Sequence, residues 1–166
     1  MVAGLGSGTA ALCAGGETGP GPYTAASEEY NKSTNTITAA AWASGGAINT
    51  SRRAVGGCGL QDAALIAGGY TTTAVADTEE YDGTSWSEQN NLSTARQAIA
   101  GFGVQTSAVF CAGNPGGSQS NATEEYDGSS FSGGGNLNTA RQAAATAGIE
   151  TAGVVFGGYA NPPDSA

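Results

Sequence analysis

The sequence predicts an all-β fold made of repeated four-stranded antiparallel units, and three observations support this prediction. The stretch TEEYDGTSW at 78–86 returns as TEEYDGSSF at 123–131, and SEEYNKSTN at 27–35 is a weaker third copy. Short apolar runs bounded by Gly, Asn and Asp favour strands and turns. The chain of 166 residues also holds 28 Gly and only 11% charged residues, which is typical of a turn-rich protein.

The repeat extends over most of the chain. The apolar run AALCAGG at 10–16 returns as AALIAGG at 63–69, as AVFCAG at 108–113 and as GVVFGG at 153–158. The last glycines of these runs are therefore 53, 44 and 45 positions apart. A period of about 45 residues indicates repeated structural units. We place these units at 2–51, 52–95 and 96–140, with a partial unit at 141–166.

Each unit has signals for four strands, which the third unit shows in order. ARQAIAGFG at 95–103 has residues that favour a helix, but its glycines disfavour one, so we predict a strand. TSAVFCAG at 106–113 is an apolar strand, and NATEEYDG at 121–128 runs into an Asp-Gly turn. SSFSGGG at 129–135 completes the hairpin. Four short strands in about 45 residues are typical of a β-propeller blade.

These residues resemble the kelch repeat, in which an apolar strand ending in Gly-Gly precedes Tyr-Asp, Trp and a Thr-x-Arg segment. The matching residues of one unit are Gly68, Gly69, Tyr81, Asp82, Trp86 and Thr94 to Arg96. The next unit departs from the pattern at Ala112 and Phe131, and the first unit at Asn31. The resemblance implies kelch-like β-propeller blades. The Gly/Ala/Thr-rich sequence is also similar to kelch-like proteins of marine bacteriophages and other environmental sequences.

The number of strand signals indicates an incomplete ring. The chain supplies about three and a half four-stranded antiparallel blades, because the last unit has only RQAAATAG at 141–148 and AGVVFGG at 152–158. Propellers use four to eight blades, and an open arc exposes strand edges. We therefore expect a larger propeller, completed either by more chain or by a different protein subunit.

The repeated polar residues have a predicted structural role. Strand alternation places Glu79 and Tyr81 on one face and Glu80 on the other, so one acidic side chain in each unit enters the layer between blades. Three arginines recur with the same period and suit a carboxylate partner. A ring of carboxylates around a catalytic or metal-binding channel is the alternative. The residues concerned are Glu28, Tyr30, Arg52, Glu79, Tyr81, Trp86, Arg96, Glu124, Tyr126 and Arg141.

Composition limits the function. A net charge of −9 argues against nucleic acid as a partner, and no apolar run is long enough to predict membrane insertion. The chain has no His, so a Cys/His zinc site lacks its nitrogen ligands. Three cysteines, Cys13, Cys58 and Cys111, do not form a disulfide framework. We predict no catalytic, cofactor-binding or metal site, and a protein that is not an enzyme.

Two classes of function follow from these observations. The first is a structural or interaction module, specifically a phage virion component such as a tail, fibre or decoration protein that makes protein or host-surface contacts. The alternative is a carbohydrate-binding module for a surface glycan, with Trp42, Trp86 or loop tyrosines such as Tyr23, Tyr70 and Tyr159 stacking on sugar rings. Either class predicts a location at the virion surface or outside the cell, and a cytoplasmic location stays open.

Overall fold

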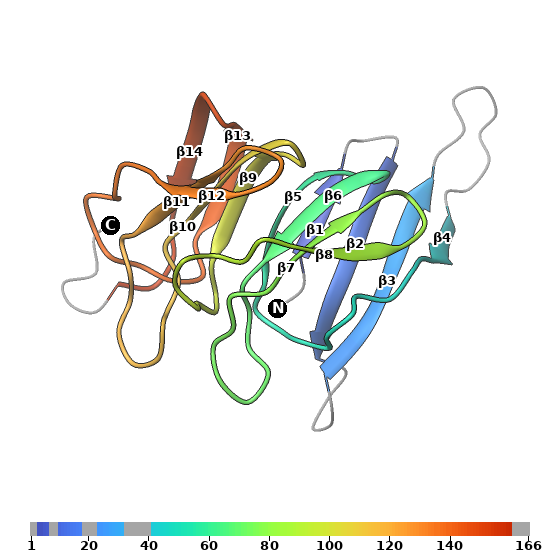
Figure 1. Cartoon of the computed structure of the whole chain (residues 1–166), viewed down its shortest axis with the longest axis horizontal. Coiled ribbons are helices and arrows are strands. Elements are labelled where there is room, and N and C mark those ends of the chain that lie inside the picture. The colour runs from blue at the N-terminus through green and yellow to red at the C-terminus, as the bar shows by residue number, and fades with distance from the viewer. Residues whose placement is uncertain (1–2, 7–9, 18–22, 32–40, 161–166) are drawn as a thin grey trace.

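The computed structural model describes residues 3–6, 10–17, 23–31 and 41–160, and these residues form strands and connecting turns. Within them there is no helix, so the all-β prediction is confirmed. The strands form three four-stranded antiparallel sheets and one two-stranded sheet (Figure 1). No helix in the described ranges is long and apolar enough to cross a membrane.

The four sheets follow the sequence order and are called sheets I to IV. Sheet I consists of β1 (Ala3–Gly6), β2 (Ala10–Glu17), β3 (Tyr23–Asn31) and β4 (Ala41–Ser44). Sheet II consists of β5 (Gly56–Leu60), β6 (Ala63–Ala67), β7 (Thr78–Tyr81) and β8 (Trp86–Gln89). Sheet III consists of β9 (Ala100–Val104), β10 (Ser107–Cys111), β11 (Thr123–Tyr126) and β12 (Phe131–Gly133). Sheet IV consists of β13 (Ala145–Ile149) and β14 (Ala152–Phe156).

The repeated sequence produces a repeated register. Ala64 pairs with Tyr81 in sheet II, and Ala108 pairs with Tyr126 in sheet III. The apolar runs that contain β6 and β10 lie in the middle of their sheets, as predicted, because these strands pair on both sides. In sheet IV the equivalent strand β14 pairs only with β13 among the described residues.

The first strands hold neighbouring sheets together. β1 contacts β5, β5 contacts β9, and β9 contacts β13, so the sheets stand side by side in sequence order (Figure 1). The segments before these strands also join through backbone hydrogen bonds, since the Ala98 N–H donates to Ala54 O at 2.8 Å and the Ala143 N–H donates to Ala98 O at 2.8 Å. The strand predicted at 95–103 is therefore correct only from Ala100, where β9 begins, and residues 95–99 form the connection before it.

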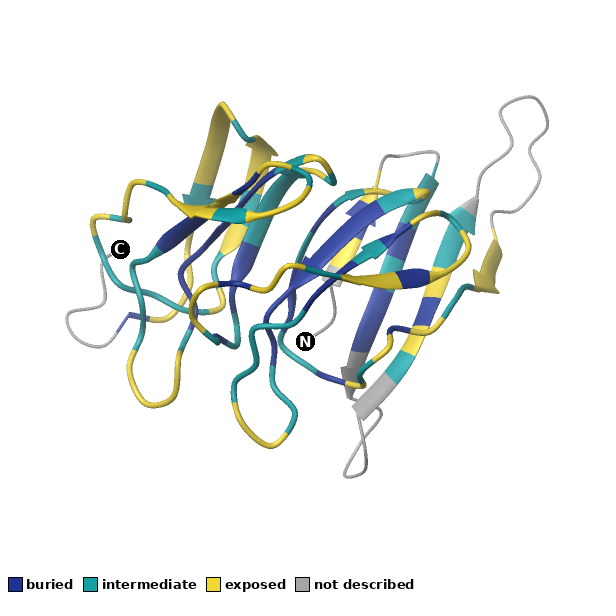
Figure 2. Cartoon of the chain, in the orientation of Figure 1, coloured by how far each residue is buried: buried dark blue, intermediate teal, exposed yellow. Residues whose placement is uncertain are grey.

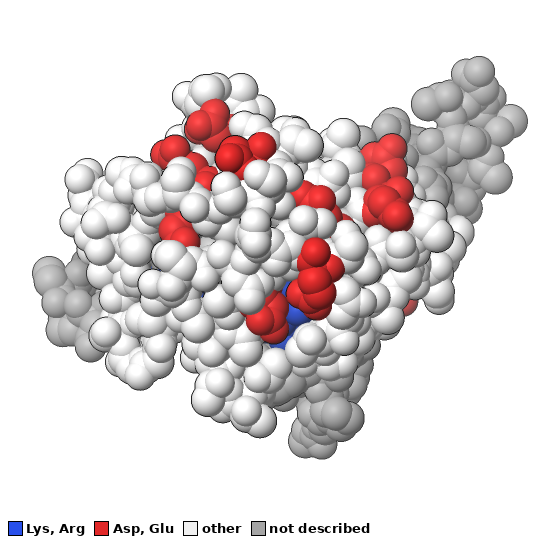
Figure 3. All heavy atoms as spheres, viewed as in Figure 1, with Lys and Arg blue, Asp and Glu red and all other residues white. Residues whose placement is uncertain are grey.

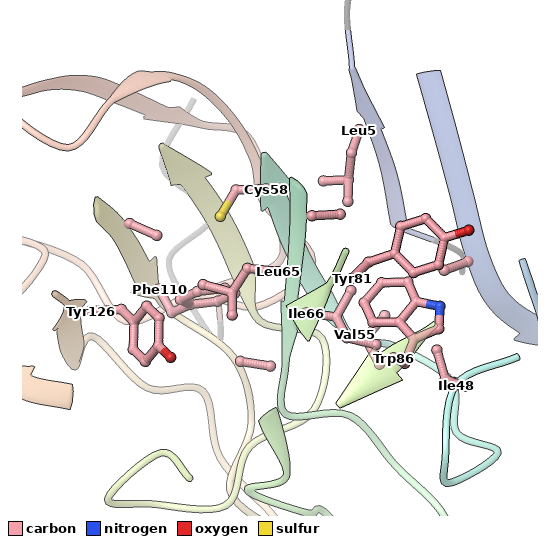
Figure 4. Close-up of a cluster of buried hydrophobic side chains, with 14 of the residues drawn as sticks. Leu5, Ile48, Val55, Cys58, Leu65, Ile66, Tyr81, Trp86, Phe110 and Tyr126 are labelled. Carbon is pink, nitrogen blue, oxygen red and sulfur yellow. The ribbon is translucent and has the colours of Figure 1, made fainter. Parts of the chain in front are cut away.

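The core lies between successive sheets. Figure 4 shows Leu65 on the side of β6 that faces Phe110 and Tyr126, and Ile66 on the side that holds Tyr81 and Trp86. Both faces of sheet II are covered in this way, which explains the uninterrupted apolar run of β6. Figure 2 shows the consequence, since buried residues concentrate in the middle of the array and exposed residues dominate β14.

Candidate interaction surface

All three repeat arginines bind a backbone carbonyl 16 residues later in the chain. Arg52 Nε donates to Gly68 O at 3.0 Å, Arg96 Nη1 donates to Ala112 O at 2.9 Å, and Arg141 Nη1 donates to Gly157 O at 2.7 Å. The constant spacing of 16 residues in the sequence thus has a direct structural cause.

Two of these arginines also form buried ion pairs. Arg52 pairs with Glu79, and both side chains are fully buried. Arg96 Nη2 lies 2.7 Å from Glu124 Oε1, with the arginine fully buried and the glutamate nearly so. The second oxygen of each glutamate accepts a backbone N–H, from Asn49 for Glu79 and from Ser93 for Glu124, each at 2.7 Å. Both oxygens of each carboxylate are therefore bound by groups of the protein itself.

Tyrosines and glutamates link each sheet to the preceding one. The Tyr81 hydroxyl in sheet II donates to Glu29 Oε1 in sheet I, and the Tyr126 hydroxyl in sheet III donates to Glu80 Oε1 in sheet II at 3.0 Å. Burial, and then the hydrogen bond to Glu80, raise the pKa of Tyr126. Burial, and then the hydrogen bond to Glu29, raise the pKa of Tyr81. Both hydroxyls therefore stay protonated donors. The sequence prediction missed this contact because it assigned the second glutamate of the motif no partner.

The N-terminal end of the array lacks a preceding sheet among the described residues. Glu28 is exposed there, and no ion pair forms at it within the described ranges. Trp42 is 55% exposed, whereas its equivalent Trp86 is buried and donates its indole N–H to Gly46 O at 3.1 Å. Tyr30 is half-buried and packs against Trp42, with ring centroids 5.6 Å apart.

Arg141 differs from the other two arginines at the C-terminal end. The prediction that every repeat arginine pairs with a carboxylate is wrong for Arg141, because no Asp or Glu lies within 4.0 Å of it in the described part of the chain. Arg52 and Arg96 obtain their carboxylates from β7 and β11. Sheet IV has no described third strand, so the equivalent carboxylate is missing.

The outer face of sheet IV is apolar and exposed. Val154 is 54% exposed, although its equivalents Leu12, Leu65 and Val109 are at most 6% exposed. Phe156 is 52% exposed, whereas the equivalent Cys111 in sheet III is buried. Each unit has the same apolar pattern, but among the described residues only sheets I to III have a following sheet that covers it.

A groove of about 270 Å³ lies between sheets III and IV. Sheet III contributes Thr123 and Glu125 to its lining, and sheet IV contributes Glu150 and Val155. Thr123 is 9% exposed, and its hydroxyl has no hydrogen-bond partner within the described ranges. At the two preceding interfaces the corresponding space holds Tyr81 with Trp86, and Tyr126 with Phe131, at centroid distances of 5.0 and 4.8 Å.

The interface between sheets III and IV fits closely where both strands of sheet IV meet β9. A Cβ atom on Gly153 would come within 2.1 Å of the Phe102 ring, so the glycine makes room for that side chain. Thr146 Oγ1 donates to Gly101 O at 2.7 Å across the same interface. Sheet IV is therefore anchored to sheet III through β13, which contacts β9, and the groove lies beside Gly153 and Val155 of β14.

The titratable groups away from these ends serve local structure. Asp82 accepts the Thr84 and Ser85 N–H groups, and Asp127 accepts those of Ser129 and Ser130, at 2.8 to 2.9 Å. These bonds lower the pKa of both aspartates.

The three cysteines are free thiols, and burial raises the pKa of Cys58 to about 12. Burial likewise raises the pKa of Cys111 to about 11. A thiol with such a pKa stays protonated near neutral pH, and only the thiolate is a good nucleophile. Cys58 and Cys111 are buried core residues, whereas Cys13 is only half-buried.

The surface charge is mainly acidic. Figure 3 shows several acidic patches on the visible face and few basic atoms. Among the described residues, no three His, Cys, Asp or Glu side chains come together in a way that could hold a metal ion. A search with protein-family models finds none that matches this sequence, and a search of curated proteins finds no significantly similar sequence.

Proposed function

We propose that this chain is a structural and interaction module without catalytic activity, and that the uncovered end at sheet IV is its main contact surface. The observation that carries the proposal is the exposure of Val154 and Phe156, at 54% and 52%, in a pattern that is buried in the other sheets. An apolar face of this kind is typical of a surface that another protein covers.

The repeated polar residues support a structural role. Glu79 and Glu124 each bind an arginine and a backbone N–H, and Tyr81 and Tyr126 each bind a glutamate of the preceding sheet. Such contacts fix the spacing and orientation of neighbouring sheets. The alternative of a carboxylate ring around a catalytic channel requires free carboxylates, whereas these two are engaged.

The finer proposal is a kelch-like β-propeller in a phage virion, as a tail, fibre or decoration protein. Its support is the sequence resemblance of the Gly-Gly, Tyr-Asp, Trp and Thr-x-Arg segments, together with four-stranded sheets that are compatible with propeller blades. The partners would be other virion subunits or the rest of a longer propeller chain.

Mass spectrometry of purified particles, together with immunogold labelling, tests the virion assignment. We expect peptides of this chain to copurify with intact particles at a fixed ratio to the capsid protein, and the label to lie on the particle surface. Recovery of the chain only from the soluble fraction of lysed cells would contradict a virion role.

The glycan-binding alternative is favoured by the exposure of two of its candidate residues, Trp42 at 55% and Tyr159 at 53%. However, Trp86 is buried in the core, so it is not available to stack on a sugar, and Trp42 lies on a face that no described sheet covers. Binding to a glycan array, measured with the native chain and with Trp42→Ala, separates the two classes. Binding that Trp42→Ala abolishes would favour the glycan module, and no binding to any glycan favours the protein-contact proposal.

A further inference from the structure

We propose that the free edge of β14 and the adjacent groove bind a β-strand of Thr-Glu-Glu-Tyr type, presented by another polypeptide, as the third strand of sheet IV. The inference rests on the proposed contact role of this end and specifies the chemistry of the partner. It uses sheets II and III as templates, because they show the same two strands with their third strands in place.

The templates define the register of the bound strand. In sheet II, Ile66 pairs with Glu79 and Ala64 with Tyr81, and in sheet III the same positions pair in the same way. The equivalent residues of β14 are Val155 and Gly153. An antiparallel partner strand therefore places its first glutamate opposite Val155 and its tyrosine opposite Gly153. Such strand addition supplies backbone hydrogen bonds to an otherwise free edge.

Charge complementarity specifies the first glutamate. Arg141 Nη1 already binds Gly157 O. Arg52 and Arg96 bind the equivalent carbonyls of their units, so the guanidinium of Arg141 is held in the same position as theirs. Its remaining N–H groups have no acidic partner among the described residues. A glutamate opposite Val155 supplies the carboxylate that Glu79 and Glu124 supply to Arg52 and Arg96.

The groove specifies the tyrosine and the aromatic residue that follows it. Glu125 corresponds to Glu29 and Glu80, which accept the hydroxyls of Tyr81 and Tyr126, but it is exposed and accepts no hydrogen bond within the described ranges. Gly135 lines the groove at the position of Gly46, whose carbonyl accepts the Trp86 indole N–H. Thr123 lines the same groove, and its hydroxyl has no hydrogen-bond partner among the described residues.

A second copy of the chain does not fit this site through its own β14. Twofold pairing would place residues 152–156 of the copy opposite the same residues, and this segment, AGVVF, has no carboxylate for Arg141 and no hydroxyl for Glu125. A strand from a different polypeptide, with glutamate and tyrosine two positions apart, supplies a carboxylate to Arg141 and a hydroxyl to Glu125.

A peptide with the sequence of residues 76–89, ADTEEYDGTSWSEQ, is the direct probe. We expect the fluorescently labelled peptide to bind the 166-residue chain saturably in an anisotropy titration. Hydrogen exchange should show new protection at β14 when the peptide is present. A scrambled peptide of the same composition should neither bind saturably nor protect β14.

Variants of the peptide test each contact without altering the protein. Replacing the glutamate at the Glu79 position by Gln should weaken binding about tenfold, because Arg141 then loses its charged partner. Replacing the tyrosine at the Tyr81 position by Phe should weaken binding by a smaller factor, about threefold, because one hydrogen bond is lost. Equal affinity of the original and Gln peptides would overturn the assignment of Arg141.

Variants of the protein complete the test. Arg141→Gln should weaken binding of the original peptide about tenfold, whereas Arg53→Gln, which removes the same charge near sheet II, should leave it within about twofold. The charge exchange of Arg141→Glu with a Glu79→Arg peptide should restore part of the affinity.

Two outcomes separate the strand proposal from the proposed function. Absence of saturable binding, or binding without protection of β14, overturns the strand proposal, and so does a dimer that forms through β14 without peptide. If the chain is nevertheless found on purified particles, the interaction role stands and only the identity of the contact is wrong.

Discussion

At the scale of single residues, a fully paired repeat arginine performs two separable tasks. It binds a carbonyl 16 positions later within its own unit, and it neutralises a carboxylate on the third strand of its sheet. Arg52 and Arg96 do both, and Arg141 does only the first. Comparison of Arg96 with Arg141 therefore measures what the buried ion pair adds, together with the full burial of Arg96 and its bond to Ala122 O.

Arg96→Ala should destabilise the chain by roughly 3–5 kcal/mol, because it leaves Glu124 buried without its counter-ion. Arg141→Ala is the matched control, and it should cost less than about 1–2 kcal/mol, since the residue is only half-buried and loses one hydrogen bond. Urea denaturation followed by far-UV circular dichroism measures both values. Equal losses of stability in the two variants would refute the distinct role of the ion pair.

The lowered pKa of Asp127 predicts a measurable pH dependence of the stability of the fold. Its backbone hydrogen bonds lower its pKa below the ordinary value of 3.8, so the folded state prefers the charged form. The stabilisation is therefore complete above about pH 3.8 and is lost as the pH falls through the lower folded pKa. An NMR titration of the Asp127 carboxyl should give a midpoint below 3.8, and Asp127→Asn should remove that part of the acid dependence of stability. A midpoint at or above 3.8 would contradict the turn geometry.

At the scale of the strands, the residue that follows each apolar strand shows whether a following sheet covers that strand. Gly68 and Gly157 have left-handed φ angles of 67° and 65°, and Ala112 adopts 63° at the equivalent position. A Cβ atom on Gly68 would lie 2.5 Å from Arg96 O of the next unit, whereas one on Gly157 meets nothing within 4 Å. The difference arises because no described sheet follows sheet IV.

Gly157→Ala should therefore cost only the left-handed strain, about 1 kcal/mol. Gly68→Ala carries the same strain and a steric clash, so it should cost roughly 1–3 kcal/mol more. Thermal or urea unfolding of the two variants, each compared with the wild type, measures the difference. Comparable destabilisation would indicate that a neighbour covers Gly157 as it covers Gly68.

The sequence pattern was sufficient to predict the strands and turns but not the contacts between sheets. Apolar runs ending in Gly-Gly or Ala-Gly located β6 and β10, and the Asp-Gly turns located β7 and β11, because local propensity and repetition agree there. The bond from Tyr126 to Glu80 joins residues 46 positions apart, and no local pattern encodes it. The positive φ of Ala98, 50°, was likewise hidden, because the connection between sheets imposes a conformation that alanine rarely adopts.

At the scale of the whole molecule, neighbouring sheets cover the inner faces of the described array, whereas its two end faces are exposed. Sheet II is covered on both faces, whereas Trp42 at one end and Val154 and Phe156 at the other are more than half exposed. The sequence predicted an incomplete array from the strand count, but only the structure identified the groove beside Glu125 and the lack of an acidic partner for Arg141 among the described residues.

Native mass spectrometry of the protein isolated from the cells or particles that produce it tests the central claim most directly, because an uncovered β14 edge and apolar face require a partner. The same sample under denaturing conditions gives the mass of the chain alone. The account predicts a native species heavier than the 16.2 kDa of this sequence, with an additional polypeptide segment covering sheet IV. A stable native monomer of 16.2 kDa, with the same mass after denaturation, would contradict it.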